Sequence, residues 1–190
     1  MHYAIEYTSS ATPADIITTA DLKAHLRVDH DDEDTLIEAV REAAIAHVEN
    51  FCNVKLGDVT AVMYLDGFPM SWEIPVGPVQ SIASISYNET TATTQTLAST
   101  AWYADLIRRP ARVSVINPPS VADYTHNGVQ IACTIGYPEA EIPAPILHAI
   151  RLIVGHFYEQ RQEVIVGVSA IELPFGIHAL LNPYRIVSFK

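Results

Sequence analysis

The sequence is poor in charge, in cysteine and in closely spaced glycines. Charged residues make up 17% of the 190 positions, against about 25% in an average globular protein. An intrinsically disordered chain would have many charges and few apolar groups, whereas 49% of this chain is hydrophobic. We therefore expect a folded protein. Its surface is either rich in hydroxyl groups or partly buried against copies of itself or a partner.

Long apolar runs are also missing. No stretch approaches the ~20 apolar residues that a membrane-spanning helix needs, and the first 16 residues lack a basic group ahead of an apolar stretch, so we expect no signal peptide. The chain has only two cysteines, Cys52 and Cys133. We interpret both as reduced thiols inside a core, as is usual in cytosolic proteins.

Basic residues are half as many as acidic ones, 11 against 22, which gives a net charge of −11. Tight binding of nucleic acid through its phosphates requires clustered Lys and Arg. The composition therefore argues against a nucleic-acid-binding protein, and the same charge disfavours docking on an anionic membrane. The one basic cluster is Arg108–Arg112, which is either a charged hairpin edge that discourages strand pairing or a contact with an acidic neighbour.

Motifs for catalysis and for cofactors are absent. No two of the eight glycines are closer than eight positions, which excludes the dinucleotide and P-loop motifs, and there is no GxSxG or CxxC. The acidic run Asp29–Asp34 lacks the Gly and Glu of an EF-hand, and we interpret it as a solvated helix-capping cluster in which Asp31 caps.

The histidines do not have metal-site spacing. His148 and His156 are eight positions apart on one expected helix, too far for one ion, and we interpret His47 as a hydrogen-bonded core imidazole. Glu139 and Glu141 are more typical of a surface linker than of a catalytic pair. The sequence therefore predicts a protein that is not an enzyme and that has no metal or cofactor.

The pattern along the chain divides into three sections: 1–56, 57–137 and 138–190. In the first, Thr18 and Asp21 form a capping box that opens a short helix. A longer helix follows the acidic run. Its expected apolar stripe contains Leu36, Val40, Ala43, Ala44, His47, Val48 and Phe51, and its expected polar face carries Glu38, Arg41, Glu42 and Glu49.

The second section alternates β-branched and polar residues between turn signals, which predicts strands. The expected strands are Val59–Leu65, Trp72–Ile74, Val79–Tyr87, Trp102–Asp105, Arg112–Ile116 and Val129–Ile135. Residues 88–100 predict an exposed hairpin or loop. In the third section, Pro143 and Pro145 open a helix with a broad apolar stripe, and a short helix and an extended tail follow a loop.

These elements predict the α+β class, with N- and C-terminal helices that form one small bundle around a central antiparallel β insertion. Specific motifs then suggest a family. The segment 17–34, ITTADLKAHLRVDHDDED, resembles the opening of tailed-phage head–tail connector (adaptor) proteins. The resemblance extends to IPAPILHAI at 142–150, to HFYEQR at 156–161 and to LPFGIHALLNPYR at 173–185. The longer members of that family have these pieces in the same order around a β insertion.

The resemblance implies a structural protein of the virion head–tail junction that is assembled in the host cytoplasm. Such adaptors form a ring, expected to be twelvefold, beneath the portal protein, and they extend the DNA channel toward the stopper or tail. DNA would pass through without specific binding, which fits the acidic composition. Ring contacts are heterologous, so each copy buries two different flanks.

Two sets of interface residues follow as hypotheses. For the subunit interface we expect the stripe of the third section, namely Ile146, Ile150, Val154 and Phe157. For the portal we expect the tail from Leu180 to Lys190 to leave the helical core and to bind through Leu181, Tyr184, Arg185 and Phe189, since aromatic and Arg side chains dominate interface energies.

Two other functions stay open. The chain could be a stopper or tail-completion protein, which would also be small, ring-forming and without catalysis. It could instead be a glycan- or ligand-binding β module, or a small hydrolase, in which Trp72, Tyr87, Trp102 and Tyr103 form a stacking platform.

Overall fold

The computed structural model describes residues 3–8, 11–90, 93–122, 126–160 and 175–187. The chain divides into two compact units. We call residues 11–57 and 138–185 the helical unit, and residues 1–10, 58–137 and 186–190 the β unit. Each unit therefore combines segments that are distant in the sequence, and both chain ends belong to the β unit.

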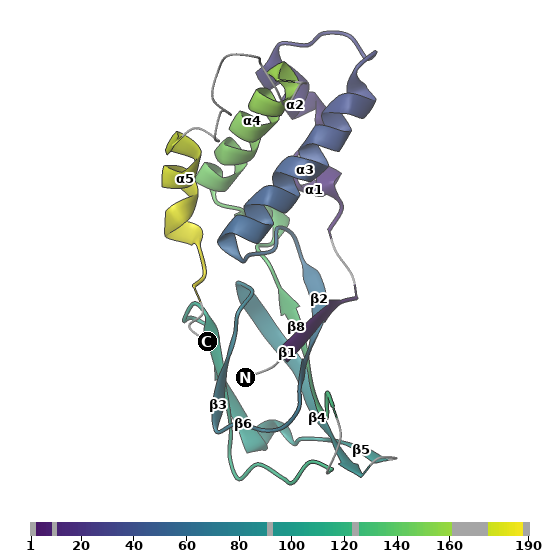
Figure 1. Ribbon diagram of the computed structural model, residues 1–190, viewed down its shortest axis with the longest axis vertical. Helices are drawn as coiled ribbons and strands as arrows, with labels where there is room; N and C mark the ends of the chain where they lie inside the picture. Colours follow the sequence, from purple (N-terminus) through teal and green to yellow (C-terminus); the bar gives the residue numbers. More distant parts are fainter. Residues whose placement is uncertain (1–2, 9–10, 91–92, 123–125, 161–174, 188–190) are drawn as a thin grey trace, which may run out of the picture. The chain divides into compact units, whose positions relative to one another are not determined.

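The helical unit contains five α-helices among the described residues, and Figure 1 shows α3 and α4 side by side within it. The helices are α1 (Pro13–Ile16), α2 (Thr19–Leu26), α3 (Asp34–Cys52), α4 (Ala144–Glu159) and α5 (Phe175–Leu181), with short 3-10 turns η2 (Glu139–Glu141) and η3 (Asn182–Tyr184). No described helix combines the length and the apolar character needed to cross a membrane.

The helix starts confirm one capping prediction and correct another. Thr18 is the N-cap of α2, and its hydroxyl accepts a hydrogen bond from the Asp21 amide at 3.1 Å. For α3 the N-cap is Glu33, without a side-chain cap bond. Asp31 does not cap this helix, because its carboxylate instead binds the ammonium of Lys23.

The buried face of α3 differs from the expected stripe by about one residue. Its buried side chains are Ile37, Arg41, Ala44, Ile45, Val48 and Cys52. Leu36, Val40, His47 and Phe51 are half-buried. The helix carries two overlapping apolar patterns at three- and four-residue steps, and the isoleucines decide between them because they bury more surface. Arg41, expected on the polar face, is consequently inside.

The helix α4 has a wide buried apolar face. Ile146, Ala149, Ile150, Ile153 and Val154 are fully buried, and the helix packs against α2, α3 and α5. Its broad stripe is therefore covered by other helices of the same chain.

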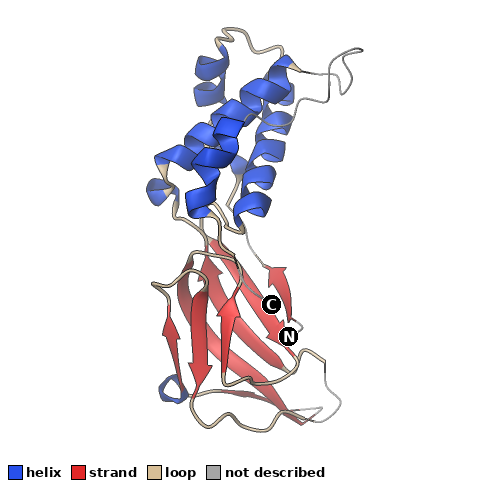
Figure 2. Ribbon diagram, turned by 60° about the vertical axis from the view of Figure 1, so that its left-hand side comes forward, coloured by secondary structure: helices blue, strands red, loops and turns tan. Residues whose placement is uncertain are grey.

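The β unit contains two antiparallel sheets that face one another (Figure 2). The larger sheet has the order β1-β2-β8-β4-β5, and the smaller has the order β3-β7-β6. The strands are β1 (Tyr3–Tyr7), β2 (Val59–Leu65), β3 (Ser71–Ile74), β4 (Val79–Thr90), β5 (Thr93–Thr96), β6 (Trp102–Asp105), β7 (Ala111–Val115) and β8 (Val129–Ile135). A third 3-10 turn, η1 (Ser99–Ala101), precedes β6.

All six expected strands are present, and three have the expected bounds. One strand was missed. Residues 3–7 were expected in the helical section but form β1, which pairs with β2 from Tyr3 opposite Leu65 to Tyr7 opposite Ala61. For residues 88–100 the expectation was an exposed hairpin or loop, and the hairpin is confirmed, because residues 93–96 form β5 antiparallel to β4 and are exposed.

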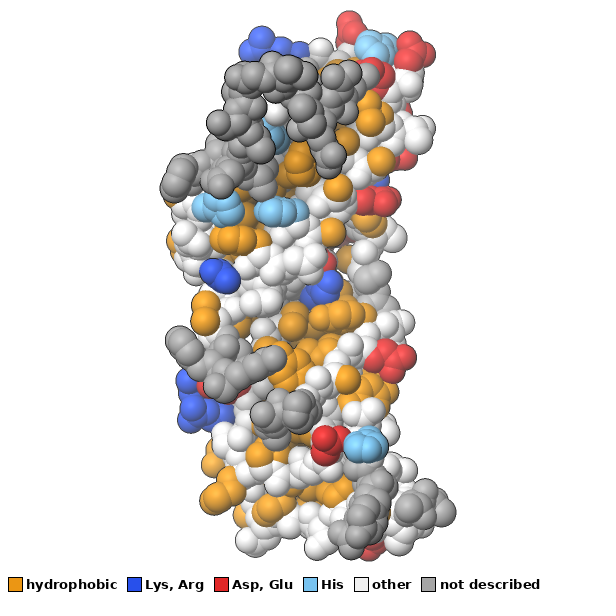
Figure 3. All heavy atoms as spheres, viewed as in Figure 1, with side chains coloured by type: hydrophobic (Ala, Val, Ile, Leu, Met, Phe, Trp, Pro, Cys, Tyr) orange, Lys and Arg blue, Asp and Glu red, His pale blue; other side chains and the backbone are white. Residues whose placement is uncertain are grey.

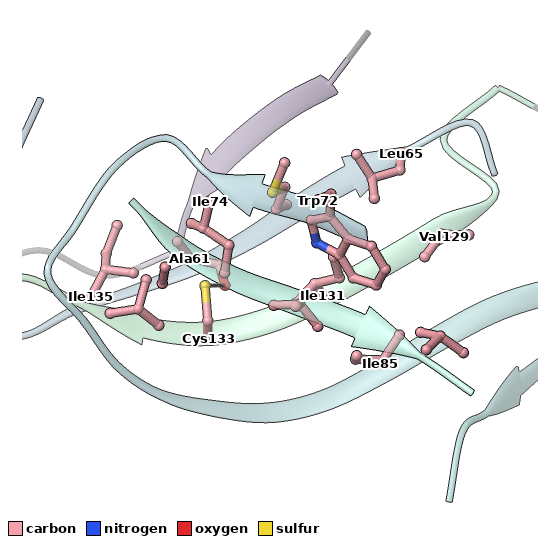
Figure 4. Packing of buried hydrophobic residues seen from close by; sticks show 14 of the residues in the cluster. Ala61, Leu65, Trp72, Ile74, Ile85, Val129, Ile131, Cys133 and Ile135 are labelled. Atoms are coloured by element: carbon pink, nitrogen blue, oxygen red, sulfur yellow. Dashed lines mark hydrogen bonds between the residues drawn. The ribbon is translucent and has the colours of Figure 1, made fainter. Parts of the chain in front are cut away.

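The core of the β unit lies between the two sheets (Figure 4). On β8, Val129, Ile131, Cys133 and Ile135 all point inward, as their alternation predicts, and each is at most 2% exposed. Trp72 and Ile74 from β3 cover them from the smaller sheet. Burial of one such side chain contributes about 1.5–3 kcal/mol, so this interface is the main source of stability in the unit.

The expected α+β class is confirmed. Helices from both terminal sections pack together in one unit, and the β insertion spans residues 58–137 of the other. The insertion is completed by β1 from the N-terminal section and by residues 186–190 from the C-terminal one, which were expected with the helices.

Candidate interaction surfaces

The expected interface stripe on α4 lies inside the helical unit. Ile146, Ile150 and Val154 are each 0% exposed, so their side chains form the core of a single copy. Only Phe157 is half-buried and partly accessible. The apolar width of α4 reflects its contacts with several helices of its own chain. Of the four residues expected at the subunit interface, Phe157 is therefore the one that a neighbouring copy could contact. Its role in that interface stays a prediction.

The expected portal-binding tail is partly fixed to the body of the protein. Leu181 is 0% exposed, and the Cys52 thiol lies 3.7 Å from its carbonyl oxygen in donating geometry. The Arg185 guanidinium lies over the Phe51 ring, 5.2 Å from its centroid. Ile186 is 3% exposed within the β unit. The expectation that the tail leaves the helical core is thus wrong for residues 181–185, whereas Ile186 belongs to the β unit.

The remaining tail residues differ in exposure. Tyr184 is half-buried, whereas Arg185 and Val187 are exposed. Phe189, the last expected anchor, lies outside the described residues. Of the four expected anchors, Tyr184 and Arg185 are therefore the described ones that a partner could contact.

Phe51 is the centre of an aromatic and cationic cluster on the helical unit. His47 stacks on it at 6.4 Å between ring centroids, and His178 contacts it at 4.9 Å. Burial lowers the pKa of His47, and the nearby His178 adds to this effect. The Nε2 atom of His47 has no hydrogen-bond partner among the described residues. The expected hydrogen-bonded core imidazole is therefore a half-buried ring held by stacking.

The acidic turn before α3 is an ion-paired structure. Lys23 Nζ lies 2.5 Å from Asp31 Oδ1 and 2.8 Å from Asp34 Oδ1. The hydrogen bonds that Lys23 donates to these carboxylates raise the pKa of Lys23, and the bond to Asp31 lowers the pKa of Asp31. Tyr158 of α4 donates a hydrogen bond to Glu33. The turn thus fastens α2 and α4 to the start of α3.

The basic cluster lies on the hairpin between β6 and β7. Arg108 and Arg112 lie 3.0 and 3.9 Å from the Glu73 carboxylate on β3. Arg109 donates to the Tyr137 hydroxyl at 2.5 Å and covers its ring. All three cations have partners within the β unit. A hairpin edge with internal ion pairs describes the cluster better than a dedicated binding site.

The aromatic platform that a glycan-binding module would need is not formed. Trp72 is 4% exposed, and it opposes Val113 on the inner face of the small sheet. Trp102 is also on the inner face, whereas Tyr103 points to the outer face and is 63% exposed. Because the rings are split between two faces, they cannot stack together on one ligand.

The surface is sparsely charged, as the composition indicates. On the face that Figure 3 shows, Lys, Arg, Asp and Glu form small separate groups with hydrophobic side chains between them. The exposed large apolar residues include Tyr3, Tyr7, Met70 and Ile107. Within the described residues, no group of three His, Cys, Asp or Glu side chains could hold a metal ion.

Comparisons with known proteins show what the chain is similar to. Residues 16–101 match the model of the family described as "Phage gp6-like head-tail connector protein". No curated protein matches the chain. A chain in the structure "Neck of empty GTA particle computed with C6 symmetry" superimposes with a TM-score of 0.78 at 21% identity, over 98% of this chain and 97% of that one.

Two further structures of gene transfer agents share the fold over the same proportions. A chain of "Virion of native gene transfer agent (GTA) particle" has a TM-score of 0.78 at 22% identity. A chain of "Neck of native GTA particle computed with C12 symmetry" has a TM-score of 0.75 at 21% identity. The family match over residues 16–101 confirms the resemblance to head–tail connector proteins that the sequence motifs indicate, and the structural matches show that the chain shares its fold with proteins of gene transfer agent particles.

Proposed function

We propose that the protein assembles as a ring at the head–tail junction of a phage-like particle, beneath the portal, and continues the channel through which DNA passes. One observation carries this proposal: the fold matches, over 98% of the chain, proteins in the necks of gene transfer agent particles. Those necks were reconstructed with C6 and C12 symmetry, which supports a ring whose copy number is a multiple of six, such as twelve.

The charge distribution fits a channel that lets DNA slide. The helical unit carries 15 acidic against 7 basic residues, and the β unit carries 7 against 4. Neither unit concentrates the free cations that neutralise phosphates. The three arginines of the β unit are also engaged, by Glu73 and Tyr137. DNA in contact with such a wall would be repelled weakly and would not be held.

The proposed contact with the portal uses the end of the chain. Tyr184 and Arg185 are accessible where the helical unit ends, and Phe189 follows four residues later in the sequence. Aromatic rings and guanidinium groups provide large contact areas and several hydrogen bonds. Leu181 supports these residues from inside the helical unit and is no longer an anchor in the proposal.

Imaging and light scattering test the proposed function directly. We expect the purified chain to form rings, alone or after mixing with the portal protein encoded beside it. A chain that stays monomeric and ignores the portal would refute the adaptor role. Binding to tail components alone would instead indicate a tail-completion protein.

Point variants test the portal contact. We expect Phe189→Ser to weaken portal binding at least tenfold and to leave the thermal midpoint unchanged. Arg185→Gln should weaken it less, because part of that side chain is already engaged on Phe51. Leu181→Ala is the structural control. Loss of this buried side chain should reduce the free energy of unfolding by about 2–5 kcal/mol and so lower the thermal midpoint. Unchanged portal binding by the first two variants would refute the tail contact.

A further inference from the structure

We propose that neighbouring copies in the ring join through their larger sheets, with strand β5 of one copy adding to strand β1 of the next. This inference rests on the proposed ring function and identifies a surface that would close the ring. The sheet would then continue from copy to copy, with main-chain hydrogen bonds across each boundary.

The two strands are the edges of the five-stranded sheet. In the order β1-β2-β8-β4-β5, each outer strand pairs with one neighbour among the described strands (Figure 1). An edge strand directs a row of N–H and C=O groups away from its sheet, and this row is a template for another strand. The edges lie on opposite sides of the sheet, so one copy can engage two neighbours.

Register shows which groups of β1 point outward. Directly opposite residues in an antiparallel pair alternate between those that exchange hydrogen bonds and those that do not. The Thr8 amide donates to the carbonyl of Thr60, its opposite residue, at 2.9 Å. Every second residue before Thr8 has the same orientation, so the backbone groups of Glu6 and Ala4 also bond to β2. The amide and carbonyl of Ile5, which lies between them, point away from β2.

The same reasoning applies to β5. The Leu97 amide donates to the Ile85 carbonyl at 2.8 Å, and the register continues toward Gln95. Gln95 therefore bonds to β4, whereas Thr94 and Thr96 direct their backbone groups outward. Both edges thus offer outward groups at every second residue, which is the spacing that strand pairing needs.

Neither edge carries Lys or Pro, two residues that monomeric β proteins place on edge strands against strand addition. Strand β1 reads Tyr-Ala-Ile-Glu-Tyr and β5 reads Thr-Thr-Gln-Thr. The Tyr, Ile and Thr residues among them favour strands. All four residues of β5 are exposed. Tyr3, 41% exposed, shares the inner face of the sheet with its buried partner Leu65, so β1 also offers an uncovered aromatic ring beside its free edge.

Strand direction makes this contact suitable for a ring. All neighbours in the sheet are antiparallel, so β1 and β5, four strands apart, run in the same direction. Rotation about a ring axis along the strands places β5 of one copy beside β1 of the next without reversing it, which gives a parallel pair. Pairing of β1 with β1, or of β5 with β5, would be antiparallel and would end in a dimer.

The first test removes one outward donor and keeps the fold. Thr96→Pro deletes an N–H that points away from β4, a position where edge strands tolerate proline. Thr96→Val is the matched control, because it keeps the N–H and the β-branched shape. We expect Thr96→Pro to reduce the fraction of chains in rings at least tenfold at an unchanged thermal midpoint, and Thr96→Val to form rings like the parent.

The second test links the strands covalently. Ala4 and Glu6 on β1, and Thr94 and Thr96 on β5, all point to the sheet face opposite the core. Neighbouring strands bring such residues within disulfide range. We expect at least one of the four double-cysteine combinations, such as Ala4→Cys with Thr94→Cys, to give a ladder of linked oligomers after oxidation. The single variants should not exceed dimers.

The outcomes separate this inference from the proposed function. Rings that are lost with Thr96→Pro, together with a ladder, support the strand contact. Rings that persist in Thr96→Pro, with no ladder from any pair, overturn the strand contact and leave the ring function standing. Absence of rings from the parent chain, both alone and on the portal, overturns the proposed function and the strand contact together. If Thr96→Pro lowers the thermal midpoint, the disulfide ladder of the second test alone decides whether the strand contact exists.

Discussion

At the residue scale, Arg41 shows how a charged side chain can be mistaken for a surface group. Its guanidinium is 5% exposed, Nη1 donates to Thr19 Oγ1 at 2.9 Å, and Nε has no hydrogen-bond partner among the described residues. The structure gives it no carboxylate partner among the described ion pairs. Such a group is costly to bury, and its long stem supplies the packing.

This environment predicts that Arg41→Met preserves or increases stability. Met keeps most of the buried stem and removes a charge that lacks a carboxylate. Arg41→Ala should instead lose about 2–5 kcal/mol, because it leaves a cavity beside Ala44 and Ile45. Chemical denaturation of the three proteins measures both effects. A loss above about 2 kcal/mol for Arg41→Met would show that the charge itself stabilises the helical unit.

The sequence pattern identifies buried residues correctly where a single hydrophobic periodicity is present. On β8, alternation placed Cys133 inward, and it is 2% exposed. On α3, two apolar periodicities overlap, and the pattern alone could not choose between them. The helix α3 contacts α4, which is about a hundred residues away in the sequence, and contacts between such distant helices leave no local signal.

At the element scale, the turn between α2 and α3 is the best-defined electrostatic feature. Lys23 lies between Asp31 and Asp34, and this arrangement raises the pKa of Lys23 and lowers that of Asp31. Asp32, next to Asp31, is 94% exposed, and only His30 lies within ion-pair distance of it, at 3.9 Å. The two aspartates therefore form a natural pair for comparison.

We expect Asp31→Asn to lower the thermal midpoint at neutral pH and Asp32→Asn to leave it nearly unchanged. Since the pKa of Asp31 is lowered by folding, its contribution is present above the ordinary value of 3.8 and is lost as the pH falls through the folded value. The difference between the variants should therefore shrink in acid, and also in high salt. Melting curves at several pH values measure it, and equal midpoints at neutral pH would contradict the ion-pair interpretation.

Element prediction succeeded for the long periodic segments and failed for short or remote ones. The bounds of β2, β6 and β8 match the expected ranges, because each alternates cleanly between turn residues. β1 was missed because its five residues pair with a strand about sixty positions later. For β5 the sequence left a hairpin or a loop open, because all of its side chains are polar and exposed and no hydrophobic alternation distinguishes the two. The interface residues expected on α4 failed for a similar reason: an apolar stripe does not reveal which chain covers it.

At the scale of the whole molecule, each unit contains one buried thiol. Cys52 belongs to the helical unit and Cys133 to the β unit, and both are free. Burial raises the pKa of each thiol to about 11. The two cysteines can therefore report separately on the two units.

We expect neither thiol to react with iodoacetamide in the native protein at about pH 8, and both to react after unfolding. A shift in pKa from 9.0 to about 11 lowers the reactive thiolate about a hundredfold, and burial also blocks access. Pulse labelling along a denaturant series, with mass spectrometry of each peptide, gives the opening midpoint of each unit. Rapid native labelling of Cys133 would contradict the closed core between the sheets.

The order of the larger sheet has a consequence for synthesis of the protein. The central strand β8 is flanked by β2 and β4, yet it is the last of the eight strands that a ribosome produces. Until residue 135 has emerged, β2 and β4 have no strand between them. The β1 strand is made first, but until then it cannot be part of the complete five-stranded sheet. A nascent or prematurely ended chain that stops before β8 thus has no larger sheet and no complete edge. In the proposed strand contact, only a chain that extends past β8 could therefore offer both edges of the larger sheet to its neighbours.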